Sequence, residues 1–500
     1  MVVIILRKDN KYKMSIAFQP NLVNQLPKVV NNKDYDDYKN TILGIDEVLR
    51  LTGLDFYCAM QHLMVKYSGK KYSITEKKLL CAMQAYRCSI LYILLGKSYR
   101  ELSIKIAESV LLQRFILQEI FDTEQIRVPS KSTLERFSKI FSTELISEQI
   151  NELLKKISGE KNILNLQDPF YVKDVYIDAT CLKANMHFPV DWVLIGDCAS
   201  TILQAIIVIR KHGLKYRIKD PKVFISQINA HLMSMTSAIR NKKNKKKRKT
   251  CFRKLKIIAK IILNHAKRYV SLLQKNGVKK TDLSKAQIAK IVEKLNSIIE
   301  IFPVAIDQAH SRIISNKQVE NKKKLLSIYH EDVNVIKRGK AGGQVEFGNT
   351  LFLAEQADGV IVDWHLYRTD VKDPQATKES ITRLINEFGT DLKSITGDRG
   401  CQSKTLSKLL KKQNIYDGLC PRSPLEFVER IKDPKFRKHQ KRRAQTEGRI
   451  GILKNKFLKG ALFERTFKGK EQKVAWAILT HNLWCLARLP KKLQEVQKAS

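Results

Sequence analysis

The spacing of strand-like and helical segments is the feature that most constrains the fold of this chain. A run of β-branched and aromatic residues within 171–180 predicts one strand, but the next strand-like run begins only at Val345. Between them, residues 200–344 carry apolar residues at i, i+3 and i+4, which predicts helices. We therefore expect an α/β fold whose first strand is separated from the others by a helical insertion.

The segments after the insertion alternate as in a mixed sheet closed by a last helix. In that last helix, Trp476 and Trp484 are the expected core anchors. A hairpin turn is expected at 357–359. The expected insertion helices are 200–209, 221–239, 254–274 and 284–301; the expected later strands are 345–356, 359–367, 394–397 and 416–420, and the later helices are 376–387, 404–411 and 474–489.

Residues 1–169 lack strand alternation and read as helices, at 77–95, 99–110 and 131–157, with Ser98 and Ser130 as N-caps. Lys131 and Arg136 fall in a helix that starts with cations and hydroxyl groups, as a helix in the major groove of DNA requires. The alternative is a plain helical bundle with a solvated polar face.

The net charge indicates a polyanionic partner. The 92 Lys and Arg residues against 49 Asp and Glu give +43, although an A+T-rich genome would also inflate the lysine count. The run 241–249 is expected to be a solvated or disordered loop whose lysines can bind phosphates without sequence preference. The apolar faces of the insertion could equally serve a partner subunit. We expect no membrane span, because no apolar run approaches about 18 residues.

The cysteines and the N-terminus predict a cytoplasmic protein. The nine cysteines are scattered without a Cys-x-x-Cys pair, which favours reduced thiols, and the histidines show no ligand spacing, so no zinc site is expected. The apolar run at 2–6 is too short for a signal peptide. The length of 500 residues favours two or three domains.

Three acids form the candidate site. Asp178 and Asp398 each close a strand-like run, and Glu447 lies on a probable helix rich in Arg and Lys. Taken singly, an Asp before a turn is ordinary, and Arg443 to Glu447 is an ordinary i,i+4 pair. Together they form a set of carboxylates of the type that divalent cations prefer. Five other acids near strands compete for the role: Asp174, Asp191, Asp197, Asp363 and Asp370.

The order Asp178, Asp398, Glu447 resembles the catalytic triad of DDE-class bacterial insertion-sequence transposases. Around the last acid, the family pattern Tyr-x2-Arg-x3-Glu-x6-Lys is matched by Arg443, Glu447 and Lys454, with Gln440 in place of the tyrosine. The segments 186–192 and 345–349 also resemble parts of these transposases.

The resemblance implies an RNase H-like core with a mixed five-stranded sheet, formed by 170–199 and 345–490. It implies an N-terminal helical domain at 1–169 that binds DNA ends, a basic helical insertion at 200–344 and a tail at 491–500. Asp178 would end the first strand and Asp398 the fourth, which are adjacent central strands in that fold.

The implied activity is cleavage at the ends of a mobile element and joining of the 3′-OH ends to target DNA. The implied cofactor is a pair of Mg²⁺ (or Mn²⁺) ions held by the three acids, and the implied partners are double-stranded DNA and further copies of the chain, at the bacterial nucleoid. The expected DNA-binding residues are Arg443, Lys454, Arg449, Arg399, Lys131 and Arg136. The alternatives are a related nuclease without strand transfer and an inert DNA-binding regulator derived from a transposase.

Overall fold

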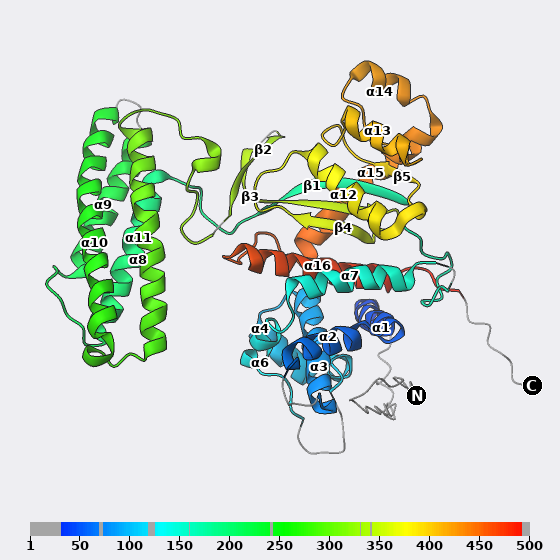
Figure 1. The fold of residues 1–500 in the computed structure, drawn as a ribbon, viewed down its shortest axis with the longest axis horizontal. Coiled ribbons are helices and arrows are strands. Elements are labelled where there is room, and N and C mark those ends of the chain that lie inside the picture. The colour runs from blue at the N-terminus through cyan, green and yellow to red at the C-terminus, as the bar shows by residue number, and fades with distance from the viewer. Residues whose placement is uncertain are drawn as a thin grey trace, which may run out of the picture.

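A computed structural model of the chain describes residues 32–69, 74–118, 126–159, 161–240, 244–330, 332–340 and 343–492. It has an N-terminal group of helices, a mixed sheet with helices packed on it, and a four-helix bundle that stands apart from the sheet (Figure 1). The expectation of an α/β protein is therefore confirmed.

The N-terminal helices begin where the sequence provides caps. Ser98 accepts a hydrogen bond in a capping box with Glu101, and Ser130 accepts one from the Thr133 amide. The prediction of one continuous helix over 131–157 was wrong, because the first helix ends at Phe137 and Ser142 caps a new one. The helices are α1 (Lys33–Thr52), α2 (Leu54–Tyr67), α3 (Glu76–Leu95), α4 (Tyr99–Glu108), α5 (Val110–Phe115), α6 (Lys131–Phe137) and α7 (Thr143–Ile157).

The sheet contains six strands in the order β2-β3-β1-β5-β6, with β4 also paired to β3. Strand β1 is antiparallel to β3 and parallel to β5. The expected count of five was wrong, because β2 lies inside the stretch expected to be helical insertion and pairs with the first half of β3. The strands are β1 (Asp174–Lys183), β2 (Asn334–Lys340), β3 (Gly343–Gln356), β4 (Ile361–Leu366), β5 (Ser394–Thr396) and β6 (Tyr416–Asp417).

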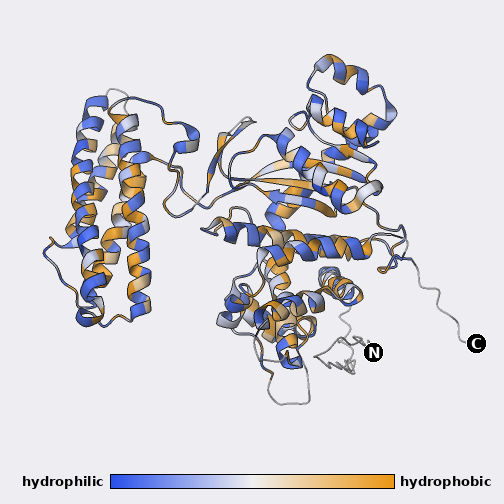
Figure 2. Cartoon of the chain, in the orientation of Figure 1, coloured by the Kyte–Doolittle hydropathy of each residue, from blue (hydrophilic) through white to orange (hydrophobic). Residues whose placement is uncertain are grey.

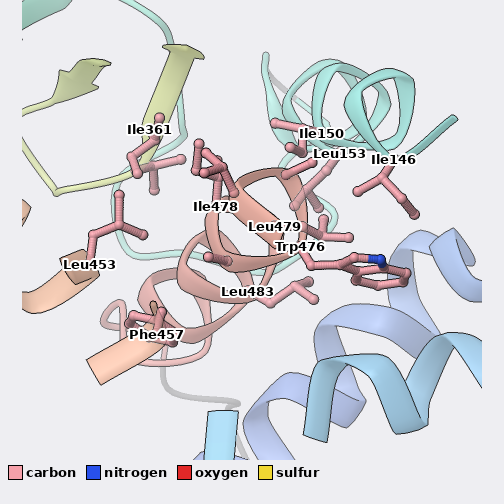
Figure 3. Close-up of a cluster of buried hydrophobic side chains, with 14 of the residues drawn as sticks. Ile146, Ile150, Leu153, Ile361, Leu453, Phe457, Trp476, Ile478, Leu479 and Leu483 are labelled. Atoms are coloured by element: carbon pink, nitrogen blue, oxygen red, sulfur yellow. The ribbon is translucent and has the colours of Figure 1, made fainter. Parts of the chain in front are cut away.

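Helix α16 (Phe467–Leu486) joins the sheet to the N-terminal helices (Figure 1). In Figure 3, Ile361 of β4 and Ile150 of α7 approach it from different sides. Of the two expected anchors, Trp476 is buried, whereas Trp484 is only half-buried. A 3₁₀ turn at Asn321–Lys323 precedes β2. The other helices after β2 are α12 (Asp373–Phe388), α13 (Lys404–Lys412), α14 (Pro424–Arg430), α15 (Pro434–Ile452), a π-helical turn (Leu453–Phe457) and a 3₁₀ turn at Gly389–Asp391.

The bundle has its own hydrophobic core, and its hydrophilic residues lie on the outside (Figure 2). Asp191 is the first residue of the bundle. Its carboxylate accepts hydrogen bonds from Arg312 (2.8 Å) and Gln308 (3.0 Å), which lie near the end of the last bundle helix. Of the run expected to be a loop, 245–249 is helical, while 241–243 lies outside the described residues. The helices are α8 (Asp191–Lys211), α9 (Pro221–Arg240), α10 (Lys245–Lys280) and α11 (Lys285–Ile313).

Helices α3 and α8 are long and apolar enough to cross a membrane, which corrects the expectation that no such run exists. More than half of each apolar stretch is buried inside the protein, 67% in α3 and 56% in α8. This burial is what a core helix of a globular protein shows, so neither helix indicates a membrane span.

Candidate active site

The pairing of β1 with β5 brings two of the predicted acids close together. The parallel pairs are Asp174 with Ser394 and Tyr176 with Thr396. Two residues further along the two chains come Asp178, still within β1, and Asp398, just after the end of β5, and the two carboxylates are close enough for the charge of Asp398 to raise the pKa of Asp178. Because side chains alternate along a strand, Tyr176 and Asp178 leave the same face of the sheet.

Helix α15, which carries Glu447, packs on β1 and β5. Arg442 forms a salt bridge with the buried Glu355 of β3 (3.2 Å), and its guanidinium lies 4.6 Å from the centre of the Tyr176 ring. One turn later, the Thr446 hydroxyl donates a hydrogen bond to the same Glu355 carboxylate (2.8 Å). These contacts fix the rotation of the helix on the sheet, and Glu447 is the next residue.

The three acids are electrostatically coupled. Burial is the largest cause that raises the pKa of Asp178, to about 6, and the backbone amide of Ala179 opposes it with a 2.8 Å hydrogen bond. The negative charges of Asp398 and Glu447 raise this pKa further, and the positive charge of Arg443 lowers it. The expectation that Asp178 ends the first strand was wrong, because β1 continues to Lys183 through its pairing with β3. Charged groups from the segment after β5 and from α15 nevertheless act on this carboxyl group in the middle of β1, across up to 269 sequence positions.

A fourth acid, Asp373 at the start of α12, lies beside Asp398. A Cβ atom added to Gly400 would be 2.6 Å from an Asp373 oxygen and 3.1 Å from an Asp398 oxygen, so the glycine leaves room for both carboxylates. Asp398 also accepts a hydrogen bond from the Cys401 amide (3.1 Å), which holds the turn. Sequence analysis missed Asp373, and its only signal is the Asp-Pro pair that begins a helix.

The donor set suits a hard divalent cation in chemical type. Its members are carboxylates, the ligands that Mg²⁺ prefers. The pKa of Asp178 is raised first by burial and then by repulsion from Asp398 and Glu447, and a bound cation would offset both. Within the described residues, however, no three acidic, His or Cys side chains are close enough to hold a metal ion as they stand. Glu447 is exposed and has no hydrogen-bond partner in the described part of the chain, so its side chain can reorient on the helix.

Two predicted cations lie beside the acids. Arg443 is half-buried close to Asp178, and its buried Nε has no hydrogen-bond partner among the described residues. Lys454 lies in the π-helical turn, where its ammonium group donates hydrogen bonds to the Cys181 carbonyl (2.8 Å) and the Thr180 hydroxyl (3.2 Å). Lys454 therefore contacts β1 directly after Asp178.

Gln440, which stands where the transposase pattern has tyrosine, has a clear structural role. Its amide nitrogen donates hydrogen bonds to the carbonyls of Gly418 (2.7 Å) and Gly397 (3.4 Å). Gly397 directly precedes Asp398, so this side chain ties α15 to the backbone of the second acid.

The remaining predicted cations form no salt bridge with the three acids among the described residues. Arg399 is exposed, with its guanidinium 5.4 Å from the Phe427 ring centre. Arg449 lies against the β3–β4 turn, where a Cβ at Gly359 would be 2.2 Å from its guanidinium, and its charge lowers the pKa of Asp358, which burial raises.

Lys131 and Arg136 are exposed on α6, among the N-terminal helices. Lys131 pairs with Glu135 (3.4 Å), and Arg136 donates a hydrogen bond to the Thr133 hydroxyl (3.3 Å). Exposed pairs of this kind contribute little to stability, so both cations remain accessible to a partner.

Most of the competing acids have structural partners. Asp363 accepts hydrogen bonds from Arg383 (2.7 Å) and Ser380 (2.6 Å), which fixes α12 on β4. Asp370 is exposed. The other three are paired as follows: Asp174 with the Ser394 hydroxyl, Asp191 with Arg312, and Asp197 with His187.

No protein-family model, curated protein or solved structure matches this chain.

Proposed function

We propose that the protein is a metal-dependent DNA transposase of the DDE class. The observation that carries the proposal is that β1, which holds Asp178, pairs with β5, whose chain continues into Asp398, while the helix of Glu447 packs on both strands. The coupling of all three acids through the pKa of Asp178 is independent support, because it depends on side chains and not on strand pairing alone.

The sheet supports an RNase H-like core within this proposal. That core requires three strands followed by alternating helix and strand, and its first and fourth strands must be neighbours. With β2 set aside as an additional edge strand, β1 and β5 are the first and fourth strands and are paired directly. Helices α12 and α13 precede β5 and β6 in the required alternation.

In the proposed reaction, Asp178, Asp398 and Glu447 would hold two Mg²⁺ (or Mn²⁺) ions. Bound ions of this kind activate the attacking oxygen and neutralise charge on the leaving oxygen. Arg443 would contact a DNA phosphate through its guanidinium fork. Lys454 would contribute positive charge while holding β1 in place. The reaction is cleavage at the ends of the element and joining of the 3′-OH ends to target DNA.

The exposed Arg399, Lys131 and Arg136 would bind DNA outside the catalytic centre, with α6 at the element ends. For Arg449 we propose only that it stabilises the β3–β4 turn, on which α15 rests. Action on paired ends implies at least a homodimer, at the bacterial nucleoid.

Two alternatives remain to be separated from strand transfer. A nuclease of the same class would cut without joining. An inert DNA-binding regulator is favoured by one observation, the absence of a closed metal-binding cluster in the described part of the chain.

The test uses the full-length protein, a supercoiled plasmid that carries the DNA flanking the gene, and Mg²⁺. We expect nicking at the element ends and joined products from the parent and from the matched control Asp307→Asn, which changes an exposed acid of α11 in the bundle. Asp398→Asn should bind the DNA but give no nicks. Unchanged nicking by Asp398→Asn would refute the proposed site; nicks without joined products would identify the nuclease, and binding without nicks by the parent would identify the regulator.

A further inference from the structure

The longest helix of the bundle, α10, has an extreme charge composition. Its 36 residues include 14 Lys and Arg and no acid, and no Asp or Glu occurs anywhere from Pro221 to Thr281. The structure describes α10 throughout, and within that description none of its cations has an acidic partner. The positive charge of this helix is therefore not neutralised within the described chain.

Four of these cations form a row on the outward face. Lys246, Arg253, Lys260 and Lys267 recur every seven residues, and all four are exposed. At 100° per residue they fall within an arc of about 60°, and at 1.5 Å per residue they are about 10.5 Å apart and span about 32 Å. We call this set the α10 row.

The α10 row persists because the other side of the helix is strongly apolar. Phe252, Leu255, Ile262 and Tyr269 are fully buried against the neighbouring helices. Burial of an aliphatic or aromatic side chain contributes about 1.5–3 kcal/mol, whereas like-charged neighbours on a helix cost only a few tenths each. Packing thus holds in place a surface that electrostatics alone would disfavour.

We propose that the α10 row binds the phosphate backbone of duplex DNA without reading its sequence, as a second contact away from the catalytic acids. The length of the α10 row is close to the helical repeat of B-form DNA, about 34–36 Å. A straight helix that lies along the duplex can therefore contact phosphates about one turn apart. Each neutralised phosphate releases counterions and so strengthens binding. The inference rests on the proposed function only in taking DNA as the polyanion.

Two other partners fit the observations less well. A membrane-bound helix buries an apolar face in the lipid, but the apolar face of α10 is already covered by the bundle. A second copy could offer Glu293, Glu300 and Asp307 of α11, which are exposed and also seven residues apart. These three acids would leave one cation of the α10 row and the other ten cations of α10 without an acidic partner.

The experiment compares two triple variants of the full-length protein. Arg253→Gln/Lys260→Gln/Lys267→Gln removes three charges from the α10 row, and glutamine keeps helix propensity. The matched control, Lys285→Gln/Lys290→Gln/Lys294→Gln, removes three exposed lysines from α11 of the same bundle. Binding to a labelled 30-base-pair duplex of arbitrary sequence is measured by fluorescence anisotropy in EDTA across a salt series, and circular dichroism confirms folding.

We expect the α10 variant to bind at least about tenfold more weakly at low salt, with a slope of log affinity against log salt about 2.7 smaller in magnitude. The control should stay within about twofold of the parent. Lys260→Gln alone should reduce the slope by about 0.9, which keeps the test valid if the triple variant folds poorly.

An α10 variant no weaker than the α11 control would overturn the inference. So would a defect confined to phosphatidylserine vesicles, or a loss of self-association in sedimentation with unchanged DNA binding. Because EDTA prevents metal-dependent cleavage, the outcome is independent of the nicking assay. Nicking with no role for α10 would refute this inference alone, and DNA binding through α10 without nicking would refute only the proposed catalysis.

Discussion

Replacing Asp178 by Asn should stabilise the metal-free protein at neutral pH while removing its activity. The pKa of Asp178 is raised from 3.8 to about 6, so above pH 6 the folded protein holds a charge that costs more free energy there than in the unfolded chain. That cost is about 3 kcal/mol at pH 8 and about 1 kcal/mol at pH 4.5, where the folded carboxyl group is mostly protonated. Asparagine avoids the charge and keeps the oxygen that accepts the Ala179 amide hydrogen bond.

The measurement is the free energy of unfolding by urea, for parent and variant, at pH 4.5 and pH 8 in EDTA. The sign follows from linkage: a raised carboxyl pKa destabilises the parent progressively as pH rises from about 4 to about 6. The advantage of the variant over the parent should therefore grow by about 2 kcal/mol between pH 4.5 and pH 8. Added Mg²⁺ should stabilise the parent at pH 8 more than the variant.

The control is Asp363→Asn, which removes a carboxylate paired with Arg383 and Ser380 and should destabilise the protein at pH 8. If the difference in unfolding free energy between Asp178→Asn and the parent is the same at both pH values, burial and the neighbouring acids do not raise the pKa of Asp178, and the reasoning about the site fails.

Two further predictions concern the site and the sheet. The rate of Mg²⁺-dependent nicking should rise with pH up to about 6, by about tenfold per pH unit below that value, because Asp178 must lose its proton to bind a cation. The midpoint of this pH profile should fall as the Mg²⁺ concentration rises. A flat profile from pH 5 to 7.5 would contradict this role for Asp178. Gly348→Ala should destabilise the protein by about 3 kcal/mol in urea denaturation, because its Cβ would lie 1.9 Å from the Leu182 carbonyl between β1 and β3. The control is Gly451→Ala in α15, where an added Cβ meets no atom within 4 Å. This variant should be more stable than the parent by less than about 1 kcal/mol. An equal loss of stability in both variants would show that the close approach of Gly348 to Leu182 is not the cause.

Local chemistry made several elements predictable. The hydroxyl groups of Ser98 and Ser130 mark helix starts because a cap satisfies backbone amides within three residues. Asp178 and Asp398 could be proposed from local sequence too, since a β-branched run that stops at an Asp is a local signal. The strand end was predicted wrongly for Asp178, because pairing with β3 extends β1 to Lys183.

Features that depend on distant partners were missed. Strand β2 carries Lys337 and little alternation, so it reads as polar sequence until β3 offers a backbone edge to pair with. Lys245 to Lys249 are helical because the following turns of α10 anchor them in the bundle, whereas a lysine run alone predicts a loop. Asp373 approaches Asp398 only through the turn at Gly400, a contact that no local pattern encodes.

The hydrogen bonds from Arg312 and Gln308 to Asp191 have a consequence for how this architecture can vary. They bring the two ends of the α8–α11 segment together, so the chain leaves the sheet and returns to it at nearly one point. A segment with adjacent ends and an interior of its own can be gained, lost or exchanged as a unit during evolution, with only a short linker needed to rejoin the flanking strands.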